Sequence, residues 1–179
     1  MPDSIFSVST PVQGGPATLV CSVTGGRGWA STLHRDRLET IDQHYGLGLV
    51  GGTLNLVSGI PIYLNTGDAF FVHQNHLFWH ARLNDMPVVV SRWRGCPLHV
   101  FEVLADTHLR TAMNLVDGSA VNLQLRPNSI DFRRSRSWKT RFAWQVLWKW
   151  RESWFYSEDW YSRAVQTRAF DTFFWRTRQ

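Results

Sequence analysis

The stretch of residues 69–92, AFFVHQNHLFWHARLNDMPVVVSR, decides the fold class of this chain. It contains three short runs rich in β-branched and aromatic residues, which favour strands. The pairs Gln74-Asn75 and Asn84-Asp85 separate the runs and are typical of turns. The stretch therefore predicts three consecutive strands joined by tight turns. These strands are predicted over Ala69–His73, His76–Leu83 and Pro87–Arg92.

Similar β-prone runs lie on both sides of this stretch, at Ala17–Val23, Thr53–Val57, Ile60–Leu64, Leu98–Ala105 and Ala120–Leu125. Two short helices are predicted between them. The first begins after Ser31 or Thr32 and ends at Gly46, and the second covers His108–Leu115. Many short strands, regular turn signals and only two short helices indicate a mainly β chain that forms a small barrel.

Composition places the chain among globular proteins. Its 179 residues are 44% hydrophobic and 18% charged, which suits one domain with a core. Membrane spans need about 18 consecutive apolar residues, and the sequence has no such run. Met1–Gln13 lacks a secretory pattern, and Cys21 and Cys96 have no metal-ligand spacing. We therefore expect a cytoplasmic protein in which both cysteines are buried or unreactive thiols.

The net charge of +5 is distributed unevenly. Residues 128–179 contain eleven Lys or Arg against five Asp or Glu, together with seven of the ten Trp. The rest of the chain is close to neutral. The predicted organisation is an irregular arm over residues 1–16, a barrel over 17–127 and a basic, Trp-rich helical extension over 128–179.

The extension shows aromatic and aliphatic residues at helical spacing, namely Trp138, Phe142, Val146, Trp150 and Trp154. The pattern predicts helix from Arg133 onward, with the stripe as one broad face packed against the barrel. The stripe also suits a homo-oligomer interface. Arg and Trp together further suit a membrane surface or single-stranded nucleic acid.

A glycine-rich loop is the first segment that could bind a ligand. Residues 23–29, VTGGRGW, follow a predicted strand and precede a predicted helix. Glycines let backbone N–H groups approach an anion, and Arg27 adds a charged donor for a phosphate. The loop matches neither the Walker A pattern nor a dinucleotide fingerprint, and on its own it indicates a hairpin-like turn.

Two further segments carry polar residues. In GGTLNL, residues 51–56, Thr53 and Asn55 share one strand face and offer the hard oxygen ligands that Mg²⁺ accepts. In FEVLADTHLRTAMNLVDG, residues 101–118, Glu102 lies on a strand and Arg110 near a helix start. Glu102 could accept a hydrogen bond from a substrate hydroxyl, and Arg110 could bind a phosphate. The alternative for these two residues, and for Thr53 and Asn55, is an ordinary side chain that faces solvent.

The three segments, in this order, resemble the archaeal CTP-dependent riboflavin kinases. That family carries Val-Ser-Gly-x-Gly-x-Gly, then Gly-Thr-Leu-Asn-Val/Leu, then Glu-Ile-Ile-Ala-Pro-x-x-Leu-Arg-x-x-Leu-Asn-Leu-Lys-Asp-Gly. The resemblance covers about residues 19–125. It implies a six-stranded cradle-loop (RIFT-like) barrel with two short helices. It also implies transfer of the γ-phosphoryl group of CTP to a hydroxyl of a small molecule, with Mg²⁺.

Site roles follow from the resemblance residue by residue. The nucleotide-binding residues it implies are Gly25, Gly26, Arg27, Gly28, Trp29, His108, Leu109, Arg110 and Thr111. Thr53 and Asn55 would hold Mg²⁺. Glu102 and Arg94 would contact the acceptor, and Arg110 and Asn55 are the predicted catalytic pair.

This sequence departs from the family pattern mainly on the acceptor side. Asp106 replaces the proline of Ala-Pro, His108 replaces a lysine and Thr111 a glutamate, while Trp93-Arg94-Gly95 lies where the family has a threonine. Riboflavin is therefore the first candidate acceptor, and a sugar or polyol is the next. A barrel that binds a ligand or assembles through its tail, without catalysis, is the alternative.

Three histidines, His73, His76 and His80, recur at spacings of three and four. On a helix they would form a zinc-binding face. Because we predict that they straddle the turn at Gln74-Asn75, we expect ordinary barrel or pocket histidines instead.

Overall fold

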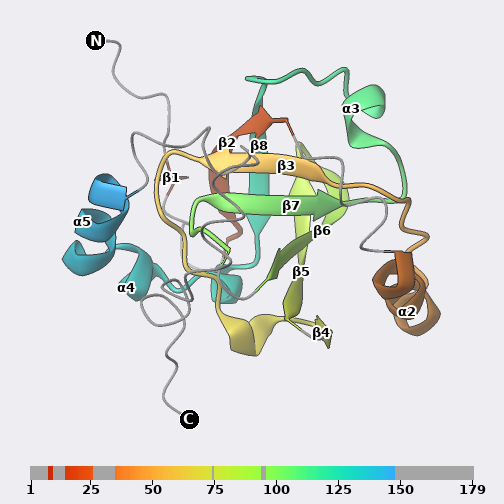
Figure 1. Cartoon of the computed structure of the whole chain (residues 1–179), viewed down its shortest axis with the longest axis horizontal. Coiled ribbons are helices and arrows are strands. Elements are labelled where there is room, and N and C mark those ends of the chain that lie inside the picture. Colours follow the sequence, from red (N-terminus) through yellow and green to blue (C-terminus); the bar gives the residue numbers. More distant parts are fainter. Residues whose placement is uncertain (1–7, 10–14, 26–34, 74, 94–95, 148–179) are drawn as a thin grey trace.

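The computed structural model describes residues 8–9, 15–25, 35–73, 75–93 and 96–147. Figure 1 shows strands crossing one another around a common core, with the short helices at the periphery. The strands are β1 (Val8–Ser9), β2 (Ala17–Thr24), β3 (Leu54–Ser58), β4 (Phe71–His73), β5 (His76–Leu83), β6 (Met86–Trp93), β7 (Val100–Leu104) and β8 (Ala120–Leu125). The helices are α2 (Arg35–Tyr45), α3 (Leu109–Ala112), α4 (Phe132–Ser135) and α5 (Trp138–Leu147), with short 3₁₀ turns η1 (Thr66–Asp68) and η2 (Pro127–Ser129).

Six strands close into an antiparallel barrel in the order β2-β3-β7-β6-β5-β8. Strand β8 closes the circle because it pairs with β2 on one side and with β5 on the other. Leu125 lies opposite both Ala17 of β2 and Ala81 of β5. The prediction of a mainly β protein built on a six-stranded barrel with short helices is confirmed.

The barrel interior is filled by the inward-facing residues of each strand. In β2, the alternating residues Ala17, Leu19, Cys21 and Val23 are all buried, as the period of a half-buried strand requires. Trp79 of β5 is fully buried, and its indole Nε1 donates to the carbonyl oxygen of Asn65 at 2.9 Å. The core thus satisfies the one polar atom of its largest side chain.

The hairpin of β5 and β6 follows the prediction closely. Strand β5 has the predicted bounds, and β6 extends one residue further at each end. Asn84 and Asp85 form the turn, with φ angles of 43° and 69°. Two consecutive left-handed residues are the requirement of a two-residue hairpin loop that matches strand twist, and Asn and Asp tolerate that conformation well.

Two predicted elements differ from the structure. The segment Ile60–Leu64 is not a strand, because Pro61 cannot donate to a ladder; Leu64 forms only an isolated bridge with Ile130. The predicted helix His108–Leu115 is reduced to Leu109–Ala112. Asn114 adopts a left-handed φ of 50°, which ends the helix early.

The described part of the predicted helical extension consists of two helices, α4 and α5, which are separated at residues 136–137. Trp138 and Phe142, the first two members of the stripe, are 72% and 63% exposed, so they do not pack against the barrel as expected. The remaining stripe residues lie outside the described side chains. Within the described residues, none of the helices has the length and apolarity to cross a bilayer.

Both cysteines, Cys21 and Cys96, are buried free thiols, as predicted. Burial raises the pKa of Cys21 to about 12, and it also raises the pKa of Cys96. Arg92 opposes the rise at both thiols. Neither thiol is therefore a reactive thiolate at neutral pH.

A buried arginine ties one end of the barrel together. Arg92 of β6 is 1% exposed, and its guanidinium lies 4.1 Å from the ring centroid of Phe101. Its Nε donates to the carbonyl oxygen of Val100 at 2.7 Å, and its two Nη atoms donate to those of Ile62 and Leu98, each at 2.6 Å. These bonds join β6 to two irregular segments that have few ladder bonds of their own.

Replacing this arginine should destabilise the barrel strongly. Arg92→Met removes the charged donor that meets the carbonyl oxygens of Ile62, Leu98 and Val100, so we expect the free energy of unfolding to fall by at least about 3 kcal/mol. Urea unfolding followed by circular dichroism measures the change. The exposed Arg133 provides the matched control, Arg133→Met. A loss below about 1 kcal/mol for Arg92→Met would contradict the assigned role.

A buried histidine makes stability depend on pH. His99 has no solvent exposure; burial lowers its pKa from 6.5 to about 3, with the charge of Arg92 as the smaller cause. The neutral ring is therefore favoured in the folded protein, and protonation is favoured in the unfolded chain. This contribution to stability is complete above pH 6.5 and is lost progressively as the pH falls toward 3.

We accordingly expect His99→Gln to unfold with a weaker pH dependence than the wild type between these two pH values. Chemical denaturation at a series of pH values measures both slopes, and the difference between them isolates His99 from the acidic residues. Parallel slopes for the two proteins would show that His99 does not carry this dependence.

Candidate functional site

The three segments singled out in the sequence meet at one end of the barrel. Thr24, the last residue of β2, lies opposite Asn55 of β3. The Nη2 atom of Arg110 donates to the carbonyl oxygen of Thr24 at 2.8 Å and to Oδ1 of Asp117 at 2.7 Å. One guanidinium thus links the start of the glycine-rich loop to the turn that precedes β8.

Backbone hydrogen bonds fix the same junction. The N–H of Val23 donates to the carbonyl oxygen of Ser119 at 2.9 Å, and the N–H of Gly118 donates to that of Val23 at 2.8 Å. Gly25 comes close to Asp117, since a Cβ built at Gly25 would lie 3.1 Å from Oδ2 of Asp117. A side chain at this position would therefore require the carboxylate of Asp117 to shift by a few tenths of an ångström. The other predicted loop residues, Gly26–Trp29, lie outside the described residues.

A cavity of about 210 Å³ opens beside this junction. It is lined by Thr53 and by all four predicted nucleotide-binding residues of His108–Thr111, together with Val50, Gly52, Leu54, Val103, Ala105 and Thr107. Leu109 is buried, whereas His108 and Thr111 are exposed at the rim. The structure therefore brings together two predicted groups that are separated by more than fifty residues.

A polar row crosses the outer face of the sheet next to this cavity. Asn55 of β3 lies opposite Glu102 of β7, and Glu102 lies opposite Ser91 of β6. Directly opposed residues are about 4.5–5.5 Å apart between Cβ atoms. Asn55 and Ser91 are 6% and 1% exposed. The two predicted site residues in this row, Asn55 and Glu102, are thus neighbours, and Ser91 is a third member.

In the part of the chain that the structure describes, the side chains of Asn55 and Ser91 in this polar row each bury an atom that has no hydrogen-bond partner. Among the described residues, Asn55 Oδ1 and Ser91 Oγ are buried and accept or donate no hydrogen bond. An unsatisfied buried polar atom costs about 1–3 kcal/mol and calls for a specific explanation, such as a ligand or ion. An amide oxygen is one of the ligands that Mg²⁺ prefers, so Asn55 fits the predicted metal role chemically.

The remaining predictions concern Arg94 and the three histidines. Arg94 lies outside the described residues. His73 and His76 face each other across the turn between β4 and β5, as predicted. His80 stacks on Phe70, with ring centroids 4.0 Å apart. In the part of the chain that the structure describes, no three His, Cys, Asp or Glu side chains are placed to share a metal ion.

Sequence reasoning missed Ser91 and Asp117 as site residues. Ser91 interrupts the apolar run Val88–Val90, and that break was the available signal. The pair Asp117-Gly118 is typical of a turn, and the partner of Asp117, Arg110, precedes it by seven residues, across the end of α3. Only the folded chain shows that Asp117 orients Arg110.

Comparisons with known proteins add no family assignment. A scan against protein-family models found no match, and a search of curated proteins also found none. The resemblance to the CTP-dependent riboflavin kinases consequently depends on the three motifs themselves.

The unsatisfied oxygen of Asn55 allows a test of whether this residue serves binding or stability. Asn55→Leu has a similar size and removes the buried polar group, so we expect the free energy of unfolding to rise by about 1 kcal/mol. We expect the same variant to lose Mg²⁺-dependent nucleotide binding. Asn122→Leu, at an exposed position of β8, is the control and should change neither property. Destabilisation by Asn55→Leu would instead assign Asn55 a structural role.

Proposed function

We propose that this protein is a CTP-dependent kinase that transfers the γ-phosphoryl group to a hydroxyl of a small molecule. Riboflavin is the first candidate acceptor, and a sugar or polyol is the next. The observation that carries the proposal is the cavity in which Thr53 lies with His108–Thr111. These are two of the three motifs of the resemblance, and Arg110 connects them to the third at Thr24.

Arg110 is suited to hold a phosphate. Asp117 and Thr24 engage its Nη2 atom and so orient the guanidinium. Its Nε and Nη1 atoms make no hydrogen bond within the described part of the chain, and the side chain is 40% exposed. A pre-oriented guanidinium with remaining donors binds phosphate oxygens in a defined geometry. Arg110 would thus contribute positive charge where the transferred group gains negative charge.

The metal role falls to Thr53 and Asn55. A hydroxyl and an amide oxygen are weak ligands alone, and they suit Mg²⁺ when nucleotide phosphates and water supply the other positions. When bound, Mg²⁺ supplies neutralisation of phosphate charge. Thr53 at the cavity and Asn55 beside it would position the phosphates relative to Arg110.

The reaction needs positioning more than a strong base. The acceptor hydroxyl oxygen forms a bond to the γ-phosphorus, and the bond from that phosphorus to the bridging β–γ oxygen breaks, which releases CDP. Glu102, opposite Asn55 in the polar row, accepts the hydrogen bond of the acceptor hydroxyl and receives its proton. Holding both substrates in line supplies most of the rate enhancement.

One observation favours a second function, in which the barrel binds a partner through its extension. Trp138 and Phe142 are exposed on α5, and the ammonium of Lys139 lies 5.9 Å from the Trp138 ring. An exposed aromatic pair beside basic residues suits a second copy of the chain, a membrane surface or single-stranded nucleic acid. This function requires no catalysis.

Isothermal titration of the full chain with CTP and with ATP, each with Mg²⁺, tests the kinase proposal. We expect CTP to bind and ATP to bind at least about tenfold more weakly. Thr53→Ala/Asn55→Ala should lose the Mg²⁺-dependent part of CTP binding, because both proposed metal ligands are removed. Conversion of riboflavin and CTP to a phosphorylated flavin and CDP, followed by chromatography, tests the acceptor.

The matched control is Thr66→Ala/Asn122→Ala, which removes the same two side-chain types from exposed positions outside the cavity. Its nucleotide binding should equal that of the wild type. Absence of binding by either nucleotide would overturn the kinase proposal and direct attention to α5. Nucleotide binding without phosphorylated flavin would retain the donor site and exclude riboflavin as the acceptor.

A further inference from the structure

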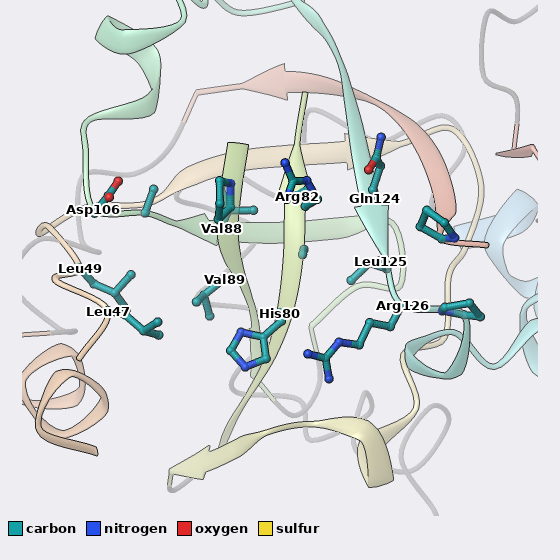
Figure 2. Close-up of a pocket in the computed structure, with 15 residues that line it drawn as sticks. Leu47, Leu49, His80, Arg82, Val88, Val89, Asp106, Gln124, Leu125 and Arg126 are labelled. Carbon is teal, nitrogen blue, oxygen red and sulfur yellow. The ribbon is translucent and has the colours of Figure 1, made fainter. Parts of the chain in front are cut away.

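A second, larger cavity lies on the barrel, outside the proposed kinase site. Its volume is about 550 Å³, within the range typical of small-molecule sites. Figure 2 shows it between the segment after α2, the outer side of β5 and β6, and the end of β8. None of the predicted nucleotide, metal or acceptor residues lines it.

One side of this cavity is apolar. Leu47 and Leu49 follow α2 and pack with Val89 of β6 in a hydrophobic cluster that also holds Ile41 and Phe78. Leu47 and Leu49 are only half-buried, so part of their surface faces the cavity. In Figure 2 these two leucines lie beside Val89. Such a wall favours an aromatic or aliphatic body by removing it from water.

The other side carries cations. Figure 2 shows the side chain of Arg126 extending toward His80. Its proximity is also evident from the pKa of His80, which burial lowers first and the positive charge of Arg126 lowers further. Stacking on Phe70 holds the His80 ring in place. Arg82 also lines the cavity, and its guanidinium donates to the carbonyl oxygen of Asp85.

Unlike Arg82, Arg126 has no hydrogen-bond or ion-pair partner among the described residues. Within the described residues its guanidinium forms no hydrogen bond and no ion pair, although it lies at the mouth of a cavity with an apolar wall. Asp106, the one acidic residue among those that line the cavity, lies far from Arg126 in Figure 2. Two arginines against one aspartate favour an anionic group at the Arg126 end.

We infer that this cavity binds a small organic anion, with its carboxylate or phosphate on Arg126 and its apolar body against Leu47 and Leu49. The inference is independent of the kinase proposal because the two cavities use different side chains, sharing Ala105 alone among the residues that line them. It assigns a second ligand to the barrel.

Three naphthalene probes that differ only in their polar group provide the test: 1-naphthyl phosphate, 1-naphthoate and uncharged 1-naphthol. Isothermal titration of the full chain should show that at least one anion binds about tenfold more tightly than 1-naphthol. The tighter of the two anions identifies the preferred head group. Arg126→Ala should reduce the affinity for that anion about tenfold, to the level of 1-naphthol.

Two further variants keep the result interpretable. Arg133→Ala removes an exposed arginine outside the cavity and should bind like the wild type. Thr53→Ala/Asn55→Ala should also bind the probes normally, and a loss there would place the anion in the kinase cavity and overturn the inference. Equal binding of 1-naphthol and the anions, unchanged affinity in Arg126→Ala, or no saturable binding would each overturn it as well.

Discussion

The closure of the barrel by β8 is the constraint on which the rest of the structure depends. Its pairing with β2 extends through Val23 and Gly118 and so brings the turn after α3 beside the end of β2. Its pairing with β5 places Arg126, the residue after β8, near His80. Strand β8 therefore lines the larger cavity directly, through Gln124 and Leu125. The pairings of β3 with β2 and with β7 bring the three motif segments together, and the pairing of β8 with β2 adds the turn at Asp117 to that site.

The sequence predicts local structure well where one physical signal dominates. The turn at Asn84-Asp85 and the alternation in β2 follow from residue types alone. A barrel was predicted, but the strands that close it were not, because the pairing of Ala81 with Leu125 joins residues that are distant along the chain. The prediction that the stripe beginning at Trp138 packs against the barrel was wrong at Trp138 and Phe142 for a related reason. The spacing of the stripe fits a packed helix face, yet only the tertiary fold decides whether a face is covered, and Trp138 is exposed.

The candidate site was partly predictable. Thr53 and the helix start at Arg110 belong to recognisable motifs, and the cavity contains both. Arg92 was not predictable as a buried residue, because a strand of that composition usually places apolar residues inward. Arg92 is tolerated only because irregular segments at the barrel end present carbonyl oxygens to its guanidinium, and those positions are set by the fold.

Arg92 and Asn55 illustrate two different reasons for burying a polar group in one barrel. The guanidinium of Arg92 meets three carbonyl oxygens, so its burial is compensated within the protein and its role is structural. Asn55 Oδ1 is buried with no such compensation among the described residues, and a leucine of similar size would avoid the cost. A chain that provides a full set of partners for the larger and charged group can provide one for an amide. The uncompensated oxygen, next to Glu102 and close to the cavity at Thr53, is the observation that supports the ligand role proposed for Asn55.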